Sequence, residues 1–133
     1  MTPTITLFYA GLSALILLGL SARVVALRRK HQVGIGTGAI NTLERAVRAQ
    51  ANFTEYVPLA LLLIALLELQ GVAGAVVHAL GALLVIGRVL HALGLNRSAG
   101  TSMGRLVGTV LTWLVLLAGG AAALGVALIQ GLG

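Results

Sequence analysis

Four long apolar segments separated by short polar connections dominate this chain of 133 residues. They cover residues 5–27, 42–69, 72–95 and 103–129 approximately. Each has at least the roughly 20 residues that a helix needs to cross a hydrocarbon core about 30 Å thick. In lipid, every backbone N–H and C=O group of a spanning segment must be satisfied internally, which favours helices. We therefore predict an all-α fold: a transmembrane four-helix bundle that forms a single domain over residues 1–133.

The composition agrees with a membrane protein and excludes several classes of site. The chain is 59% hydrophobic and 9% charged, whereas soluble domains are roughly 25% charged. The net charge of +6 is explained by lysines and arginines in the loops and helix ends that flank a membrane, where they meet membrane lipids. No nucleic-acid partner is expected, because the sequence shows no basic surface interspersed with aromatic residues. The chain has no cysteine, which excludes disulfides and thiolate–metal sites. Its histidines are not paired with carboxylates at ligand spacing, so we predict no metal.

The positive charges gather around two of the three connections between the segments. Around the first are Arg23, Arg28, Arg29, Lys30, Arg45 and Arg48; around the third are Arg88, Arg97 and Arg105. The second connection and both ends of the chain have no lysine or arginine. By the positive-inside rule, we expect the first and third connections to be cytoplasmic and both termini to face the outer side of an inner or plasma membrane.

The second segment is only apolar between residues 57 and 67, which is too short to cross a membrane as a helix. To span, the helix must extend back through Glu55 and Asn52 toward Arg48. Such groups cannot face lipid, so we expect them to face other helices or a water-filled cavity. Asn41 or Thr42 is expected to cap this helix, with Glu44 in its first turn. Pro58 is expected to bend it.

Depths can be compared by counting from the short turn at Gly71. Glu55 lies sixteen residues before Gly71 and Arg88 seventeen after it, so both lie about 25 Å from the outer surface. Asn52 and His91 lie about one turn closer to the cytoplasm. The sequence therefore predicts a group of polar side chains in the cytoplasmic third of the bundle.

Arg48, Asn52, Glu55 and Tyr56 follow one face of the second helix, at positions i, i+4, i+7 and i+8. This face offers a cation, an amide, a carboxylate and a phenol, which suits a zwitterionic, peptide-like ligand. The alternative is that Glu55 pairs with Arg48 or Arg88 and only holds the bundle together.

Residues 44–58, which read ERAVRAQANFTEYVP, resemble the signature of the MAPEG family, the membrane-associated proteins of eicosanoid and glutathione metabolism. They are especially similar to the leukotriene-forming glutathione transferase, which has the pattern Arg-Ala-Gln-x-Asn-x-x-Glu-Tyr-x-Pro. Arg28-Arg29, Arg88 and Arg97-Ser98-Ala99 extend the resemblance over the four-span plan, although only the motif in the second helix is specific.

The resemblance implies a homotrimer that binds glutathione as co-substrate between subunits, near the cytoplasmic face. A lipophilic small molecule or lipid would be the second partner. By this resemblance, the glutathione-binding residues are expected to be Arg28, Arg48, Gln50, Asn52, Glu55, Tyr56 and Arg88. His91, which departs from the family pattern but lies at the depth of Asn52, is added to this set as a further expected contact.

The chain departs from the family pattern where the thiol would be activated. The leukotriene-forming enzyme has two tyrosines where this chain has His91 and Leu95, and its thiolate-stabilising arginine falls near Thr101 or Ser102. A free thiol has a pKa near 8.5, so it needs a nearby cation or hydrogen-bond donor to ionise at neutral pH. Arg105 and Ser102 are the expected catalytic residues, with His91 as a further candidate.

Two minor features also carry predictions. Gly104, Gly108 and Thr112 recur every four residues, a spacing that lets helix backbones approach closely within or between subunits. His78 lies near the outer leaflet, away from the motif, and is expected to act in helix packing.

The leading functional hypothesis is a glutathione-binding membrane enzyme that conjugates glutathione to a lipophilic electrophile or reduces a lipid hydroperoxide. One alternative is a non-catalytic protein of the same family that binds and presents lipids. A less favoured alternative is a small multidrug exporter, because such exporters need a glutamate that exchanges protons freely. Here Glu55 is expected to lie beside Arg48 and Arg88, which should depress its pKa.

Overall fold

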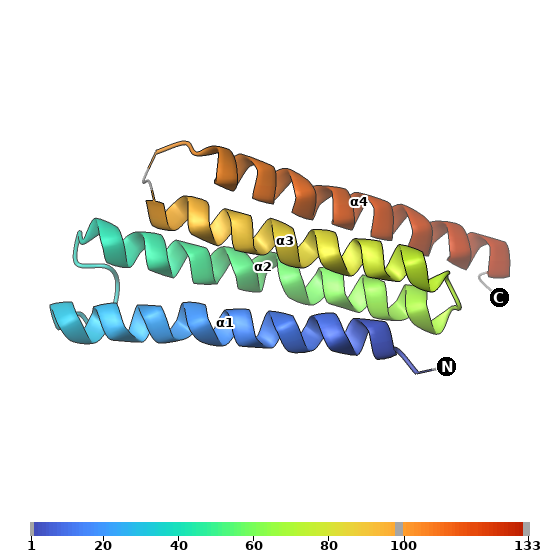
Figure 1. Ribbon diagram of the computed structural model, residues 1–133, viewed down its shortest axis with the longest axis horizontal. Helices are drawn as coiled ribbons and strands as arrows, with labels where there is room; N and C mark the ends of the chain where they lie inside the picture. Colours follow the sequence, from blue (N-terminus) through green and yellow to red (C-terminus); the bar gives the residue numbers. More distant parts are fainter. Residues whose placement is uncertain (1, 98–99, 132–133) are drawn as a thin grey trace.

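The computed structural model describes residues 2–97 and 100–131, which form four long helices. They are α1 (Thr4–His31), α2 (Asn41–Leu69), α3 (Gly74–Arg97) and α4 (Met103–Gln130). Consecutive helices run in opposite directions, and the two ends of the chain lie at the same end of the bundle (Figure 1). All four are long and apolar enough to cross a membrane. The predicted all-α transmembrane four-helix bundle is therefore confirmed.

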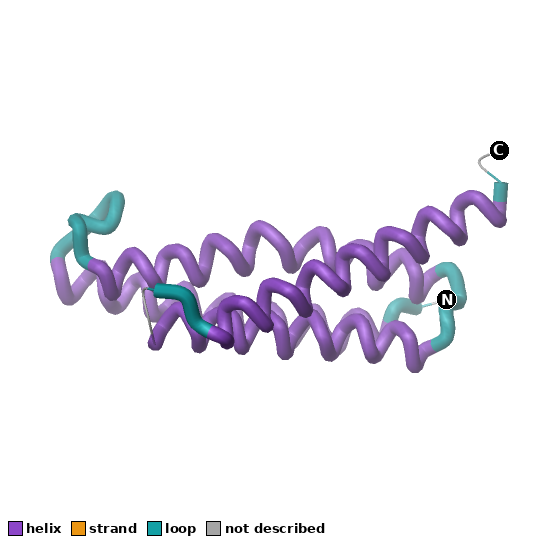
Figure 2. Tube along the Cα trace, turned by 90° about the horizontal axis from the view of Figure 1, so that it is seen from above, coloured by secondary structure: helices purple, strands orange, loops and turns teal. Residues whose placement is uncertain are grey.

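The helices are arranged around α2 and α3, which lie between α1 and α4. Seen from above, α4 crosses its neighbours and its C-terminal end leans away from them (Figure 2). On α2, buried residues recur with helical spacing at Phe53, Val57, Ala60, Ile64 and Leu67. They pack against apolar side chains of α3 and α4 and form the main core.

The ends of the helices differ from the sequence-based bounds for local reasons. The first helix continues to His31 instead of ending near residue 27, so four basic residues occupy its last turn, where the helix dipole favours cations. The predicted cap at Asn41 or Thr42 is wrong: the N-cap is Ile40, which makes no side-chain cap bond. Ile40 packs instead against the small buried cluster around Leu43, so apolar burial sets the start of α2.

Two further details of α2 and α3 bear on the sequence-based bounds. Glu44 lies in the first turn of α2, as predicted, and Pro58 lies inside the helix without ending it. The third helix begins at Gly74, two residues later than expected. Val72 belongs to the turn, where its N–H donates to the carbonyl of Leu67 at 3.1 Å.

A buried carboxylate from α2 closes the N-terminal end of α1. Glu68 accepts hydrogen bonds from the backbone N–H groups of Ile5 (2.8 Å) and Thr6 (2.7 Å) and from the hydroxyl of Thr6 (2.7 Å). The N-cap residue of α1 is Pro3, which has no capping side chain. The first N–H groups of a helix lack intrahelical partners and favour an anion. Glu68 therefore supplies from α2 the cap that α1 lacks.

The same end of the bundle has a second link between helices. The hydroxyl of Tyr9 on α1 lies 3.2 Å from Nδ1 of His78 on α3. A Cβ atom at Gly81 would lie 2.3 Å from the Tyr9 ring, so only glycine lets the ring lie flat against α3. His78 thus has the packing role predicted for it, and α1 is joined to both α2 and α3.

We predict that Glu68→Leu destabilises the protein, because it removes the acceptor of three hydrogen bonds at a helix end. The loss expected is about 1–2 kcal/mol, the usual cost of deleting an N-cap acceptor. Thermal unfolding in nanodiscs measures it, and hydrogen exchange should accelerate at the amides of Ile5 and Thr6 but not at those of Leu43 and Glu44. Unchanged exchange at Ile5 and Thr6 would show that the cap is not formed.

Candidate functional site: two adjoining cavities

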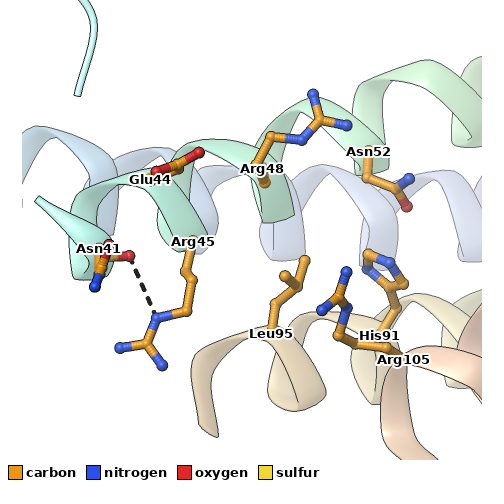
Figure 3. Close-up of a pocket in the computed structure, with 8 residues that line it drawn as sticks. All are labelled: Asn41, Glu44, Arg45, Arg48, Asn52, His91, Leu95 and Arg105. Carbon is orange, nitrogen blue, oxygen red and sulfur yellow. Dashed lines mark hydrogen bonds between the residues drawn. The ribbon is translucent and has the colours of Figure 1, made fainter. Parts of the chain in front are cut away.

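A polar cavity of about 300 Å³ opens between the N-terminal turns of α2, the C-terminal turns of α3 and the start of α4 (Figure 3). Its lining residues are Asn41, Glu44, Arg45, Arg48, Asn52, His91, Leu95 and Arg105. We call it the polar cavity. Three guanidinium groups and one carboxylate line it, so it carries a net positive charge and favours an anionic ligand.

The α2 side of the polar cavity is one face of the helix. Asn41, Glu44, Arg45, Arg48 and Asn52 occupy positions i, i+3, i+4, i+7 and i+11, which align on a helix of 3.6 residues per turn. The sequence-predicted stripe thus extends two turns further toward the N-terminus of α2 than Arg48.

A second cavity of about 530 Å³ adjoins the first along the start of α4 and is called here the α4 cavity. It is lined by His91, Thr101, Ser102, Met103, Arg105, Leu106 and Thr109. Met103 is 73% exposed and Leu106 59% exposed, as expected for apolar side chains that face lipid. His91 and Arg105 line both cavities, so these two side chains form the wall between them.

Arg88 lies behind the polar cavity and joins three helices. It is 2% exposed; its Nη1 donates to Oδ1 of Asn52 on α2, and its Nη2 donates to the carbonyl of Gly108 on α4 at 3.2 Å. The same carbonyl accepts the hydroxyl of Thr112 at 2.8 Å. The guanidinium carbon lies 5.6 Å from the centroid of the Tyr56 ring, within cation–π range. Arg88 thereby fixes the side chain of Asn52 in the cavity wall.

Glycines allow α3 and α4 to come into backbone contact beside the cavities. A Cβ atom at Gly108 would lie 2.4 Å from the carbonyl oxygen of Gly87 and 2.6 Å from the amide nitrogen of His91. At Gly94 a Cβ atom would lie 2.6 Å from the amide nitrogen of Arg105. The close packing predicted from the small residues of α4 is thus confirmed within one chain, and it places His91 beside Arg105.

The structure brings together most of the sequence-predicted site residues but not all. Arg48, Asn52, His91 and Arg105 line the polar cavity, Arg88 and Tyr56 lie behind it, and Ser102 lines the α4 cavity. Arg28, Gln50 and Glu55 do not line the cavities of their own chain.

Arg28 turns toward the first loop instead. Its Nη1 donates to three backbone carbonyls, those of Val33 (3.3 Å), Gly34 (3.1 Å) and Gly36 (3.0 Å). Gly36 has a φ of 71°, a left-handed conformation that glycine adopts without strain and that folds the loop back toward α1. In the single chain, Arg28 therefore braces the loop between α1 and α2.

Gln50 and Glu55 also lie outside the polar cavity. The amide of Gln50 donates to the hydroxyl of Ser21 on α1 at 2.8 Å, so it fixes α2 to α1. Glu55 is exposed on the surface of the single chain. The alternative prediction paired Glu55 with Arg48 or Arg88. The hydrogen bonds of Arg88 go instead to Asn52 and to the carbonyl of Gly108.

Some lining residues were missed by sequence reasoning. In the polar cavity they are Asn41, Glu44 and Arg45; in the α4 cavity they are Met103, Leu106 and Thr109. Helical spacing from Arg48 already pointed to the first three, whose polarity was assigned to capping, the helix dipole and the positive-inside rule. Nothing in the pattern marked Met103 and Leu106, because apolar side chains near a helix start are also what lipid contact requires, and a single threonine such as Thr109 does not stand out in a membrane helix.

Four membrane-spanning helices with a cation-rich cavity at one end define a multi-pass integral membrane protein. The chain matches the model of the MAPEG family over residues 6–125. It is 35% identical over 113 residues, 85% of each chain, to the inner membrane protein YecN of Escherichia coli strain K12. The YecN protein of Escherichia coli O6:H1 strain CFT073 gives the same identity and coverage. The chain belongs to the MAPEG family, as the motif in α2 predicted.

The backbone contact between α3 and α4 gives a prediction with a matched control. Gly108→Ala should push the two helices apart and weaken the bond from Arg88, with a loss of stability of about 2 kcal/mol or more, as for other overpacked cores. Gly120→Ala on the same helix, where a Cβ atom would meet nothing within 4 Å, should be neutral or stabilising by up to about 1 kcal/mol. Thermal unfolding of the two variants compares them, and equal stability would contradict the packing described.

Proposed function

We propose that this protein binds glutathione in the polar cavity and transfers it to a lipophilic electrophile held in the α4 cavity. The observation that carries the proposal is the wall of His91 and Arg105 shared by a cationic cavity and a partly apolar one. A thiol on one side of this wall is close to a substrate on the other. Family membership makes glutathione the first ligand to test.

The charges of the polar cavity complement those of glutathione. The tripeptide has two carboxylates, one ammonium group and a thiol. Arg45 and Arg48 on α2 and Arg105 on α4 offer forked donors for carboxylates or a thiolate. Glu44, which lines the same cavity, is an acceptor for the ammonium group. Asn52, held by Arg88, offers its amide to the peptide backbone.

The positions of the cavities suit one water-soluble and one lipid-soluble substrate. Counting about 20 residues back from Leu69 along α2 crosses the hydrocarbon core and reaches the region of Ala49. Residues before this point, including Arg45, lie at the headgroup level and are open to water. The positive-inside rule assigns this end to the cytoplasm, where glutathione is found. Leu106 in the α4 cavity lies further into the membrane and meets substrates that arrive from lipid.

Arg105 is the residue proposed to stabilise the thiolate. A nearby guanidinium favours the ionised sulfur, and the thiol proton passes to water at the cavity mouth. With a chlorinated aromatic substrate, the sulfur–carbon bond forms and the carbon–chlorine bond breaks, with chloride taking the electron pair. With a lipid hydroperoxide, the thiolate attacks the terminal peroxide oxygen, the oxygen–oxygen bond breaks, and the alkoxide leaves and takes a proton from water. The glutathione sulfenic acid formed reacts with the thiol of a second glutathione to give the disulfide and water.

A homotrimer is proposed because the single chain leaves part of its site uncovered. Glu55 is exposed on α2 in a segment that crosses the membrane, and a carboxylate there cannot face lipid. Leu59, Leu62 and Leu66 continue the same exposed face. A neighbouring copy on this face would cover Glu55 and bring a second set of side chains, including Arg28, toward the polar cavity.

The binding proposal predicts that the purified protein in nanodiscs takes up glutathione, measured by isothermal titration calorimetry. Arg48→Ala should weaken binding about tenfold or more, because a charge-assisted bond to a carboxylate is lost. Arg105→Ala should lower turnover of 1-chloro-2,4-dinitrobenzene by about tenfold or more. Arg29→Ala, at an exposed position outside both cavities, is the control and should change neither.

If calorimetry shows no heat of binding up to millimolar glutathione, the binding proposal is wrong. Binding without turnover, unaffected by Arg105→Ala, would favour the lipid-presenting alternative.

The trimer proposal predicts a mass of three chains in nanodiscs, measured by native mass spectrometry. Glu55→Lys should reduce the trimer fraction, because it replaces a covered carboxylate with a cation next to an arginine-rich face. Thr54→Ala is the neighbouring control, since the Thr54 hydroxyl donates only within its own helix, to the carbonyl of Ala51 at 2.8 Å. A wild-type mass of one chain at every concentration would contradict the trimer.

A further inference from the structure

A groove of about 270 Å³ lies between α1 and α2 in the membrane-spanning part of the bundle. It is lined by small and apolar side chains together with Ser13, Thr54 and Pro58, and it shares none of its lining residues with the polar cavity or the α4 cavity. Among the described residues, α1 contacts α2 and α3 but not α4. Thr54 and Pro58 are exposed at the rim of the groove, so this is a separate site that opens toward the membrane.

The hydroxyl of Ser13 is buried in this groove without a hydrogen bond. Ser13 is 4% exposed, and within residues 2–97 and 100–131 no side chain or backbone group is bonded to its hydroxyl. A hydroxyl in a membrane helix can donate to a carbonyl of its own helix, as Thr54 and Thr112 do at 2.8 Å. Because a buried hydroxyl without a partner is costly, the groove favours a molecule that supplies one.

Pro58 leaves a second polar group of the groove without its usual partner. Proline has no N–H, so the carbonyl of Thr54, four residues earlier, lacks the donor that an α-helix normally provides. The hydroxyl of Thr54 donates to Ala51 and does not replace that donor. The groove therefore offers one hydroxyl and one backbone acceptor among otherwise apolar walls.

The depth of Ser13 limits the kind of molecule that can reach it. Ser13 lies nine residues after Thr4 and ten before Arg23, which is about 14 Å and 15 Å along the helix axis. Because a hydrocarbon core is about 30 Å thick, Ser13 lies near its centre, away from the headgroups on either side. A lipid chain that carries an oxygen function along its length can bring a hydrogen-bonding group to this depth.

The size and lining of the groove favour such a chain over a water molecule or a second copy of the protein. A single water needs only roughly 15 Å³ and two to four polar partners, whereas most of this wall is apolar. A neighbouring copy that used the exposed leucines of α2, which are Leu59, Leu62 and Leu66, would cover the groove without giving Ser13 a partner.

We propose that this groove binds a fatty-acyl chain that carries a hydroxyl group part of the way along its length. The chain packs against the apolar walls, and its hydroxyl oxygen accepts the hydrogen of Ser13. The carbonyl of Thr54 is an acceptor for a hydroxyl of the same chain. This inference goes beyond the proposed function, because it concerns a lipid site on α1 and α2 that does not depend on glutathione.

A competition between fatty acids in nanodiscs tests the proposal, with native mass spectrometry measuring how much of each the protein retains. 12-Hydroxystearate places its hydroxyl deep in the membrane, 2-hydroxystearate places it beside the carboxylate, and stearate has none. The wild-type protein should retain 12-hydroxystearate about threefold to tenfold over each of the others, the ratio expected for one hydrogen bond. Ser13→Ala should bring this ratio close to one.

Ser21→Ala is the matched control, because it makes the same change on α1 outside the groove. The hydroxyl of Ser21 already has Gln50 as its partner, so the retention ratio should stay at the wild-type value. Ser13→Ala should not lower the melting temperature without added fatty acid, since it removes a hydroxyl that has no partner. This measurement confirms that the Ser13 variant is folded.

Equal retention of the three fatty acids by the wild-type protein would overturn the inference, as would an unchanged ratio in Ser13→Ala. If Ser13→Ala instead lowers the oligomer mass in the same spectra, the groove holds a neighbouring copy and the inference is wrong. None of these results depends on glutathione, so the proposed function is tested separately.

Discussion

The guanidinium group of Arg88 is the interaction on which the cavity end of this bundle depends. From α3 it binds the Asn52 side chain on α2 and the Gly108 carbonyl on α4. Within the described residues, Nη1 and Nη2 of Arg88 have these partners and its buried Nε has none. Loss of either partner would leave the buried cation still less satisfied, which is costly. The Gly108 carbonyl can be reached because glycines on α3 and α4 let the two backbones touch. The Arg88 side chain and the glycines of α3 and α4 thus determine where the wall of the polar cavity lies.

The two ends of the bundle differ in the sign of the charge that they hold. At the end that holds the chain termini, Glu68 is placed at the C-terminal end of its own helix, where the dipole disfavours an anion. It is stable there because it caps the N-terminus of α1. At the other end, Arg45 and Arg48 of α2 and Arg105 of α4 line the polar cavity. The first end is closed by its own hydrogen bonds, whereas the second has a cavity lined by three arginines and one glutamate.

Much of this arrangement could be predicted from sequence, because lipid imposes simple rules. The length and hydropathy of the segments predict four helices, and counting residues from the turn at Gly71 places Arg88 and Asn52 at neighbouring depths. Of the three predicted site residues that lie outside the cavities, Arg28 and Gln50 have a competing local partner, whereas Glu55 is exposed. Arg28 donates to three loop carbonyls, and Gln50 donates to the hydroxyl of Ser21. Neither hydrogen bond can be predicted from the spacing of residues along a helix. The role of Glu68 could not be predicted either, since it requires knowing which helix end lies beside it.

The central claim is that the polar cavity holds glutathione with its sulfur at the wall shared with the α4 cavity. A cryo-electron microscopy structure of the protein in nanodiscs with saturating glutathione tests this most directly. The account predicts density for the tripeptide between Arg48, Asn52 and Arg105, with the sulfur next to His91. Density at another place, or an empty cavity at saturating ligand, would contradict it.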